Sequence, residues 1–222
     1  YDKPVLYFPY FFHPDPTVKR QSGFLMPTFQ NSNNSGASLQ IPYYKVISDR
    51  KDVTFFPRLF FDNEILLQTE YRQANKNSDL VLDFSLNNDE SGTKRHIFLD
   101  IESNKENKEI NFHVETVSND TYLKQENIES SIHNDRSLLY SYLNYSSIET
   151  DSSLEISLEA YEDLNKKKTD RFEYIFPNFD YEKNLNNDDL SAKGELVYNA
   201  RGFNKNYNTN SDETILINDL KY

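Results

Sequence analysis

One stretch of the chain reads Asp79-Leu80-Val81-Leu82-Asp83-Phe84-Ser85-Leu86. Its even-numbered residues are all apolar, and three of its four odd-numbered residues are polar. Successive side chains of a β-strand point to opposite faces, so this alternation puts an apolar row on one face and a mainly polar row on the other. The stretch therefore predicts a β-strand that separates two different environments.

The same alternation recurs on both sides of this stretch. Clear repeats lie at 97–101, 110–114 and 154–160, and weaker ones at 138–147, 171–181, 190–200 and 213–221. Clusters of turn-forming Asn, Asp, Ser and Gly separate them at 31–36, 87–92, 104–108 and 185–189. We expect an all-β fold of roughly ten strands after residue 20, joined as an antiparallel up-and-down meander.

One segment interrupts the meander. Residues 119–136 show neither a strong period of two nor a full helical stripe. We expect a long loop with a helical turn, which in a membrane barrel would be extracellular.

The strand faces leave two architectures open. Charged residues occupy nearly every polar face, while the opposite faces are aliphatic or aromatic. This fits the wall of a transmembrane barrel around a wet lumen, and it equally fits a soluble β-sandwich with one solvated face.

Composition excludes several classes of protein. The net charge of -12 and the scattered Lys and Arg argue against nucleic-acid binding. The longest apolar run, at 5–12, is far shorter than the about 20 residues that a membrane-spanning helix needs. The chain has no cysteine, and it opens at Tyr1 without a signal-peptide pattern, so we expect an excised segment of a longer protein.

The amino-terminal third carries five short motifs in order. They are Tyr7-Phe8-Pro9-Tyr10-Phe11, Lys19-Arg20-Gln21-Ser22-Gly23-Phe24-Leu25-Met26-Pro27, Pro42-Tyr43-Tyr44, Asp52-Val53-Thr54-Phe55-Phe56-Pro57 and Glu70-Tyr71-Arg72. This succession resembles the LptD (Imp, OstA) family of lipopolysaccharide-assembly proteins. The resemblance is specific over residues 4–73, and from 78 to 222 it is general.

The resemblance implies a fold and a function. Residues 1–20 would end a periplasmic β-jellyroll and its linker, and residues 21–222 would form the N-terminal part of an outer-membrane β-barrel that is not closed. Such a barrel moves lipopolysaccharide into the outer leaflet of the outer membrane of Gram-negative bacteria without covalent chemistry. Its partners would be an LptE-like lipoprotein plug and an LptA-like periplasmic bridge protein, with the N-terminal residues on the periplasmic side.

Three prolines at equal intervals, Pro27, Pro42 and Pro57, fall in consecutive strand candidates. Proline removes a backbone donor, so each weakens the sheet locally by roughly 0.5–1.5 kcal/mol. Pro27 and Pro42 match the lateral-gate prolines of the family, which implies that they ease the opening of the first strand. Pro57 we assign to a bulge or strand end.

Other residues are candidates to contact the lipid. The aromatic residues Tyr7, Phe8, Tyr10, Phe11, Phe12 and Phe24 are candidates to line the route of the acyl chains, or to pack in a core. Arg58 and Arg72 are candidates to contact lipid A phosphates, because Arg bonds phosphate through two donors.

No catalytic or metal site is expected. His13, His96, His113 and His133 lie in separate segments without ligand spacing, and no cofactor motif is present. Two other functions stay open at this stage: a soluble β-sandwich that binds glycans as an adhesin-like module, and a generic porin-like channel segment. A firmly paired strand around Pro27 would favour the porin-like channel.

Overall fold

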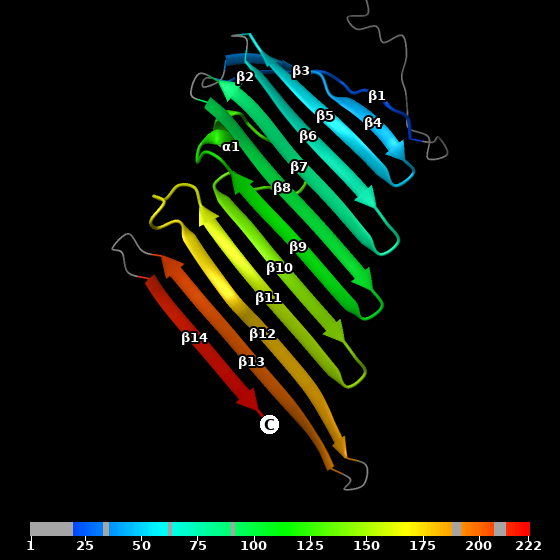
Figure 1. Cartoon of the computed structure of the whole chain (residues 1–222), viewed down its shortest axis with the longest axis vertical. Helices are drawn as coiled ribbons and strands as arrows, with labels where there is room; N and C mark the ends of the chain where they lie inside the picture. The colour runs from blue at the N-terminus through cyan, green and yellow to red at the C-terminus, as the bar shows by residue number, and fades with distance from the viewer. Residues whose placement is uncertain (1–19, 33–35, 62–63, 90–91, 188–191, 207–211) are drawn as a thin grey trace, which may run out of the picture.

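A computed structural model of the chain describes residues 20–222 apart from 33–35, 62–63, 90–91, 188–191 and 207–211. The elements are β1 (Gly23–Phe24), β2 (Thr28–Ser32), β3 (Gly36–Gln40), β4 (Tyr43–Ser48), β5 (Lys51–Phe60), β6 (Ile65–Ala74), β7 (Ser78–Asp89), β8 (Gly92–Lys105), β9 (Lys108–Val117), α1 (Tyr122–Gln125), β10 (Leu138–Ile148), β11 (Ser152–Asp163), β12 (Phe172–Asn187), β13 (Ala192–Asn206) and β14 (Asp212–Lys221). All 14 strands belong to one antiparallel sheet (Figure 1).

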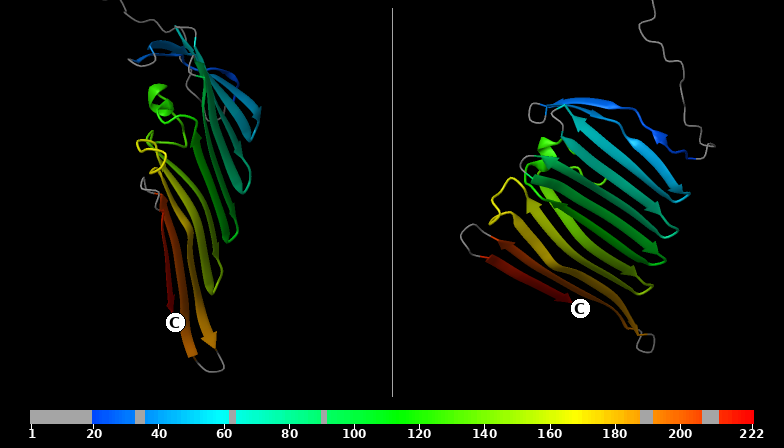
Figure 2. Two further views of the ribbon diagram at one scale, coloured as in Figure 1. Left: turned by 60° about the vertical axis from the view of Figure 1, so that its left-hand side comes forward. Right: turned by 45° about the horizontal axis from the view of Figure 1, so that its top comes forward.

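The sheet is an open meander. From β4 to β14 each strand pairs with its neighbours in sequence, and the two edges are formed by β1 with β2 and by β14. Figure 2 shows a single curved layer, with α1 on one side of it. The predicted all-β, unclosed meander is confirmed.

The described residues form 14 strands, more than the expected ten or so, in part because proline-containing breaks divide two strands. Several strands are also longer than the sequence indicated. The turns predicted at 87–92 and 185–189 are shorter, since β7 runs to Asp89 and β12 to Asn187. The expected boundary between jellyroll and barrel concerns residues 1–20, nearly all of which lie outside the described residues.

The two faces of the sheet have opposite surroundings. The apolar face, which carries Phe55, Leu67, Leu86, Ile97 and Leu143, is exposed, each of these side chains being 36–47% accessible. The other, polar face carries buried Asp83, Ser85 and His96. A soluble sandwich would bury its apolar rows against a second sheet, and among the described residues no second sheet exists.

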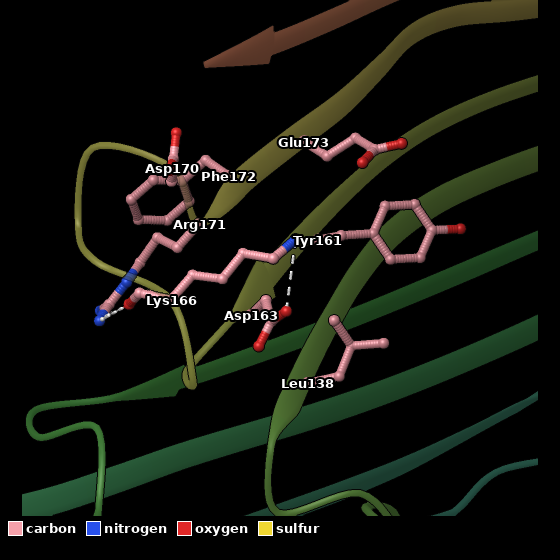
Figure 3. A pocket seen from close by; sticks show the side chains of 8 residues that line it. All are labelled: Leu138, Tyr161, Asp163, Lys166, Asp170, Arg171, Phe172 and Glu173. Atoms are coloured by element: carbon pink, nitrogen blue, oxygen red, sulfur yellow. Dashed lines mark hydrogen bonds and ion pairs between the residues drawn. The ribbon is translucent and has the colours of Figure 1, made fainter. Parts of the chain in front are cut away.

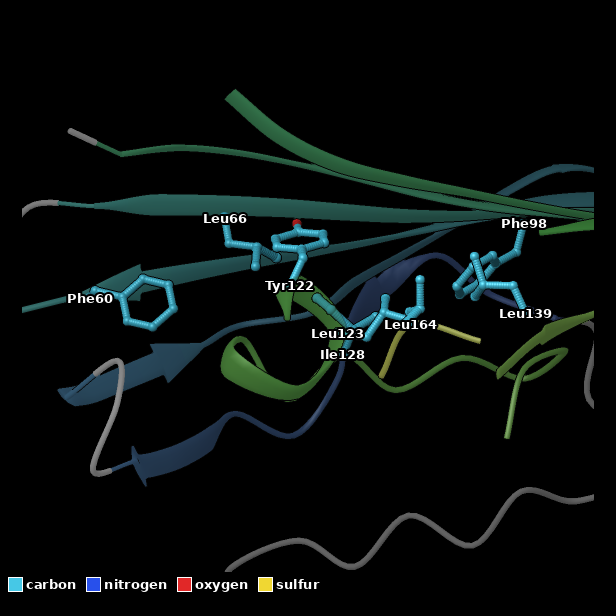
Figure 4. Close-up of a cluster of buried hydrophobic side chains, with 8 residues drawn as sticks. All are labelled: Phe60, Leu66, Phe98, Tyr122, Leu123, Ile128, Leu139 and Leu164. Atoms are coloured by element: carbon cyan, nitrogen blue, oxygen red, sulfur yellow. The ribbon is translucent and has the colours of Figure 1, made fainter. Parts of the chain in front are cut away.

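A small core lies between the polar face and the cap segment, defined here as residues 118–137 with α1. Its buried members are Phe60, Leu66, Phe98, Tyr122, Leu123, Ile128, Leu139 and Leu164. Figure 4 shows the Tyr122 ring from α1 directed at the sheet strands. The helical turn expected in 119–136 is present, but the segment packs against the sheet. No helix within the described residues is long and apolar enough to cross a membrane.

Candidate functional site

The leading edge of the sheet is built from two interrupted strands. Residues 25–27 separate β1 from β2, and residues 41–42 separate β3 from β4. β1 pairs with β4, and β2 pairs with β3. We call these four segments the leading pair: a first strand over 23–32 and a second strand over 36–48.

Pro27 lies in the break of the first strand. Phe24 pairs with Tyr43, and Thr28 pairs with Gln40. Between these two pairs the first strand advances by four residues, whereas the second strand advances by three. The first strand therefore carries one extra residue, which is the geometry of a β-bulge. Pro27 itself is exposed and outside β1 and β2, so the strand around it is not continuously paired.

Pro42 is buried in the break of the second strand. Its carbonyl accepts a hydrogen bond from the Leu25 N–H at 2.9 Å. In an antiparallel ladder such a pair normally exchanges two bonds, and proline has no N–H to return. The two strands of the leading pair thus hold each other with one bond fewer at this level.

Pro57 differs from the expectation. It lies inside β5, paired with Leu67 of β6, and no register shift occurs along the β5–β6 ladder. The bulge or strand end assigned to it is absent here, and its carbonyl accepts the Ile41 N–H at 3.2 Å.

The predicted aromatic lipid path divides into two groups. Tyr7, Phe8, Tyr10, Phe11 and Phe12 lie outside the described residues. Phe24 is 76% exposed, and its ring meets Tyr43 edge to face with centroids 5.0 Å apart.

Arg58 lies under the cap segment. It is 3% exposed, and its Nη1 donates to the backbone carbonyl of Glu126 in a short hydrogen bond. A phosphate contact at Arg58 stays a prediction, and it requires the cap segment to move aside.

Arg72 belongs to a charge cluster at the opposite end of the strands. Its Nε donates to Asp52 Oδ1 at 2.8 Å, and Arg20 Nη1 donates to Asp52 Oδ2 at 2.6 Å. The side chains of both arginines are nearly half exposed, whereas the Asp52 side chain is 5% exposed. Two guanidinium groups thus share one buried carboxylate, and Arg20 Nη2 also donates to the backbone carbonyls of Ser48 and Asp49.

A buried polar network fixes the cap segment to β7 and β8. Ser85 Oγ lies 2.6 Å from His96 Nδ1 and 2.7 Å from the Tyr122 hydroxyl, and His96 Nε2 lies 3.2 Å from Asp83 Oδ1. The residue types match a hydrolase triad. All four side chains are at most 1% exposed, so no substrate reaches Ser85, and the network serves packing.

A second contact joins the cap segment to β9. Glu115 Oε1 lies 3.0 Å from His113 Nε2 and 2.7 Å from His133 Nδ1. Glu115 Oε2 accepts a hydrogen bond from the Tyr140 N–H at 2.8 Å. The fold thus brings together two histidines that sequence spacing kept apart. Within the described ranges no group of three or more His, Asp or Glu could hold a metal ion.

An ion pair closes the far side of the cap segment. Arg171, in the 164–171 loop, donates to Asp120 through both terminal nitrogens at 2.9 and 2.7 Å, and to Glu162 at 3.0 Å. The bonds to Arg171 lower the pKa of the Asp120 carboxyl, and the same contact raises the pKa of Arg171. The adjoining cleft has a volume of about 220 Å³. Figure 3 shows its lining side chains, among which Lys166 reaches Asp163.

Sequence reasoning missed the packing of the cap segment on the polar face. The only local signal was a mixture of charged residues with Tyr122 in residues 119–136, which show neither a strong period of two nor a full helical stripe. The partners are distant in sequence: Gln68, for example, donates to the Glu129 carbonyl at 2.7 Å across a separation of 61 residues.

Comparison with known proteins adds an independent result. A family described as LptD protein matches residues 2–215. The LPS-assembly protein LptD of Pseudomonas entomophila (strain L48) is 37% identical over 94 residues, 42% of this chain and 10% of that protein. The LPS-assembly protein LptD of Idiomarina loihiensis is 32% identical over 129 residues, 55% of this chain and 17% of that protein. The chain thus corresponds to a small part of these relatives.

Proposed function

The chain belongs to the LptD protein family, and from this premise we propose that it forms the leading strands of an outer-membrane barrel that delivers lipopolysaccharide to the outer leaflet. The family match extends the resemblance beyond residues 4–73, through most of the meander. The observation that carries the proposal is the leading edge of the sheet, where prolines lie in the breaks of two adjacent strands.

The exposed apolar face supports a lipid-facing wall. Exposed large apolar side chains recur on strands across the sheet, including Phe29, Leu59, Ile65, Ile110 and Phe176. A bilayer supplies the apolar surroundings that this face lacks within the described residues, and water fits the charged opposite face. The other candidate, a soluble glycan-binding sandwich, needs a second sheet to cover this face, and the described residues contain none.

The breaks supply a mechanism for release. Pro42 cannot return a bond to Leu25, and the first strand is bulged near Pro27. Each missing bond removes roughly 0.5–1.5 kcal/mol from the pairing, so the edge strand separates more readily than its neighbours. A glycolipid could then leave the barrel sideways, with its acyl chains in the bilayer.

The remaining parts of the proposal concern substrate and partners. Lipopolysaccharide would pass without covalent change from an LptA-like periplasmic bridge, and an LptE-like lipoprotein would fill the lumen. Phe24 would lie beside the acyl chains at the edge, and Arg72 would be the more accessible phosphate contact. The short turns at 49–50 and 106–107 would face the periplasm, and the cap segment the cell exterior.

The test uses the full-length protein in cells. Pro27→Ala and Pro42→Ala each return a backbone donor, so the surface level of newly made lipopolysaccharide should fall, with the double variant lowest. Ile41→Ala is the matched control, because it alters a neighbouring side chain without adding a donor. Unchanged export in the double variant, at equal barrel abundance, would refute the gate.

A further inference from the structure

We infer that the moving part of the gate is the whole leading pair, residues 23–32 with 36–48, and that Pro57 marks the seam along which it parts from β5. This inference rests on the proposed function and assigns to Pro57 a positioning role in the gate. It adds a second weakened seam to the one between the first and second strands.

The hydrogen bonds across the seam carry the first step. Along one edge of β5, the Phe61 N–H donates to the Ala37 carbonyl and the Pro57 carbonyl accepts from Ile41, both at 3.2 Å. The register is constant from Ser38 opposite Phe60 to Val46 opposite Asp52. In this register a residue at 57 other than proline would donate to the Ile41 carbonyl. Pro57 cannot do so, and the seam lacks that bond.

The two weak points lie at one level of the sheet. Ile41 meets Pro57 on one side of the second strand, and the next residue, Pro42, meets Leu25 on the other side. The second strand is therefore poorly held on both sides over two consecutive residues. A strand loosened on both sides does not provide a fixed support against which the first strand alone could swing.

β5 supplies that support, since its other side is firmly held. It pairs with β6 without a register shift from Lys51 to Leu59. Asp52 is bonded to Arg72 of β6, and Arg58 is bonded to the cap segment. The boundary between the held and loosened parts of the sheet thus coincides with the seam at Pro57.

The leading pair stays attached at the turn near residue 49. Arg20 bonds Asp52 of β5 at 2.6 Å, and the Val46 N–H donates to Ser22 Oγ at 2.9 Å. These contacts tie both strands of the pair together at this end and anchor them to β5. The pair would therefore open from its other end, where Ser38 to Gln40 face β5.

Engineered cysteine pairs in the full-length protein test which seam opens. Residues directly opposite each other at non-hydrogen-bonded positions lie about 4.5 Å apart at Cα, close enough for a disulfide. Ser38→Cys with Phe60→Cys would lock the opening end of the second strand to β5. Phe24→Cys with Tyr43→Cys would lock the two strands of the leading pair. Phe55→Cys with Thr69→Cys would lock β5 to β6 as a control.

Each variant is compared with its own reduced form. Oxidation of the 38–60 pair should stop export, whereas oxidation of the 55–69 pair should leave it unchanged. Oxidation of the 24–43 pair closes the seam between the first and second strands, so it should lower export as the proposed gate requires. Export that continues with the 38–60 bond closed, in cells where closing the 24–43 bond lowers it, would overturn the seam at Pro57. The proline variants at 27 and 42 test the gate separately, so the gate can stand while this inference fails.

Pro57→Ala provides a second measurement. It should slow export by roughly two- to tenfold, the effect of one restored backbone bond on the open population. A rate equal to the parent protein, in cells where Pro42→Ala slows export, would also overturn the inference.

Discussion

Arg171 and Asp120 join two loops that are 51 residues apart in sequence, through two bonds of 2.9 and 2.7 Å. The Arg171 side chain is 4% exposed and the Asp120 side chain 46%. The pair holds one end of the cap segment, whose other contacts reach β5 to β9. Five positions yield tests that do not depend on export: Arg171, Asp120, Tyr122, Gly202 and Ile97.

Removing the ion pair should loosen the cap segment. We expect Arg171→Ala to weaken cap closure by about 1 kcal/mol, a modest value because Asp120 is half exposed. Hydrogen–deuterium exchange of backbone amides in residues 118–137 would report it as faster exchange. Lys166→Ala, in the same loop but bonded only to Asp163 by its side chain in the described structure, should leave the exchange unchanged.

The same pair should make the cap sensitive to acid. The pKa of Asp120 is lowered by its bonds to Arg171, so the folded protein favours the ionised form. Its contribution is present above the ordinary pKa of 3.8 and is lost as the pH falls below it. Asp120→Asn should abolish this acid dependence of amide exchange, and a persisting dependence would point to another group.

Tyr122 should show the opposite dependence on pH. Burial raises its pKa to about 12 from 10.0, so the folded protein favours the neutral hydroxyl. The contribution is present below pH 10 and is lost as the pH rises toward 12. In Tyr122→Phe this alkaline loosening should disappear, and cap stability at neutral pH should fall by about 1 kcal/mol with the lost bond to Ser85.

Gly202 of β13 should tolerate no side chain. A Cβ built there would lie 2.0 Å from the Phe176 carbonyl oxygen of the neighbouring strand. Because the obstacle is backbone, Gly202→Ala should force β12 and β13 apart and lower the yield of folded barrel. Gly194→Ala on the same strand meets only the Leu185 Cβ at 3.9 Å and should fold normally, as measured by heat-resistant compact migration in gels.

The apolar face should reject charge if lipid surrounds it. Ile97 and Glu102 are both exposed on β8 but lie on opposite faces. Ile97→Arg should cost up to about 2–4 kcal/mol, depending on its depth in the bilayer, and reduce barrel assembly. Glu102→Arg should be tolerated. Equal tolerance of both substitutions would contradict a lipid-facing surface.

The sequence alone determined the strands and their faces. Alternation at 79–86, 97–101 and 110–114 is a local property with a period of two, and each of these stretches became part of a strand. The positions of Pro27 and Pro42 likewise predicted a local weakening of the sheet, because a missing donor is inherent in the residue. Long strands such as β12 were underestimated, since Asn and Asp at 186–189 read as a turn.

Tertiary structure decided what those elements contact. Whether the missing donor of Pro57 weakens the seam with β4 or with β6 depends on the pairing register, which arises only when distant strands align. The cap segment contacts Gln68 and Arg58, and Asp52 binds two arginines. These contacts likewise join residues that are far apart in sequence. Such contacts leave no periodic signal, because they depend on which polar groups the folded sheet brings into reach.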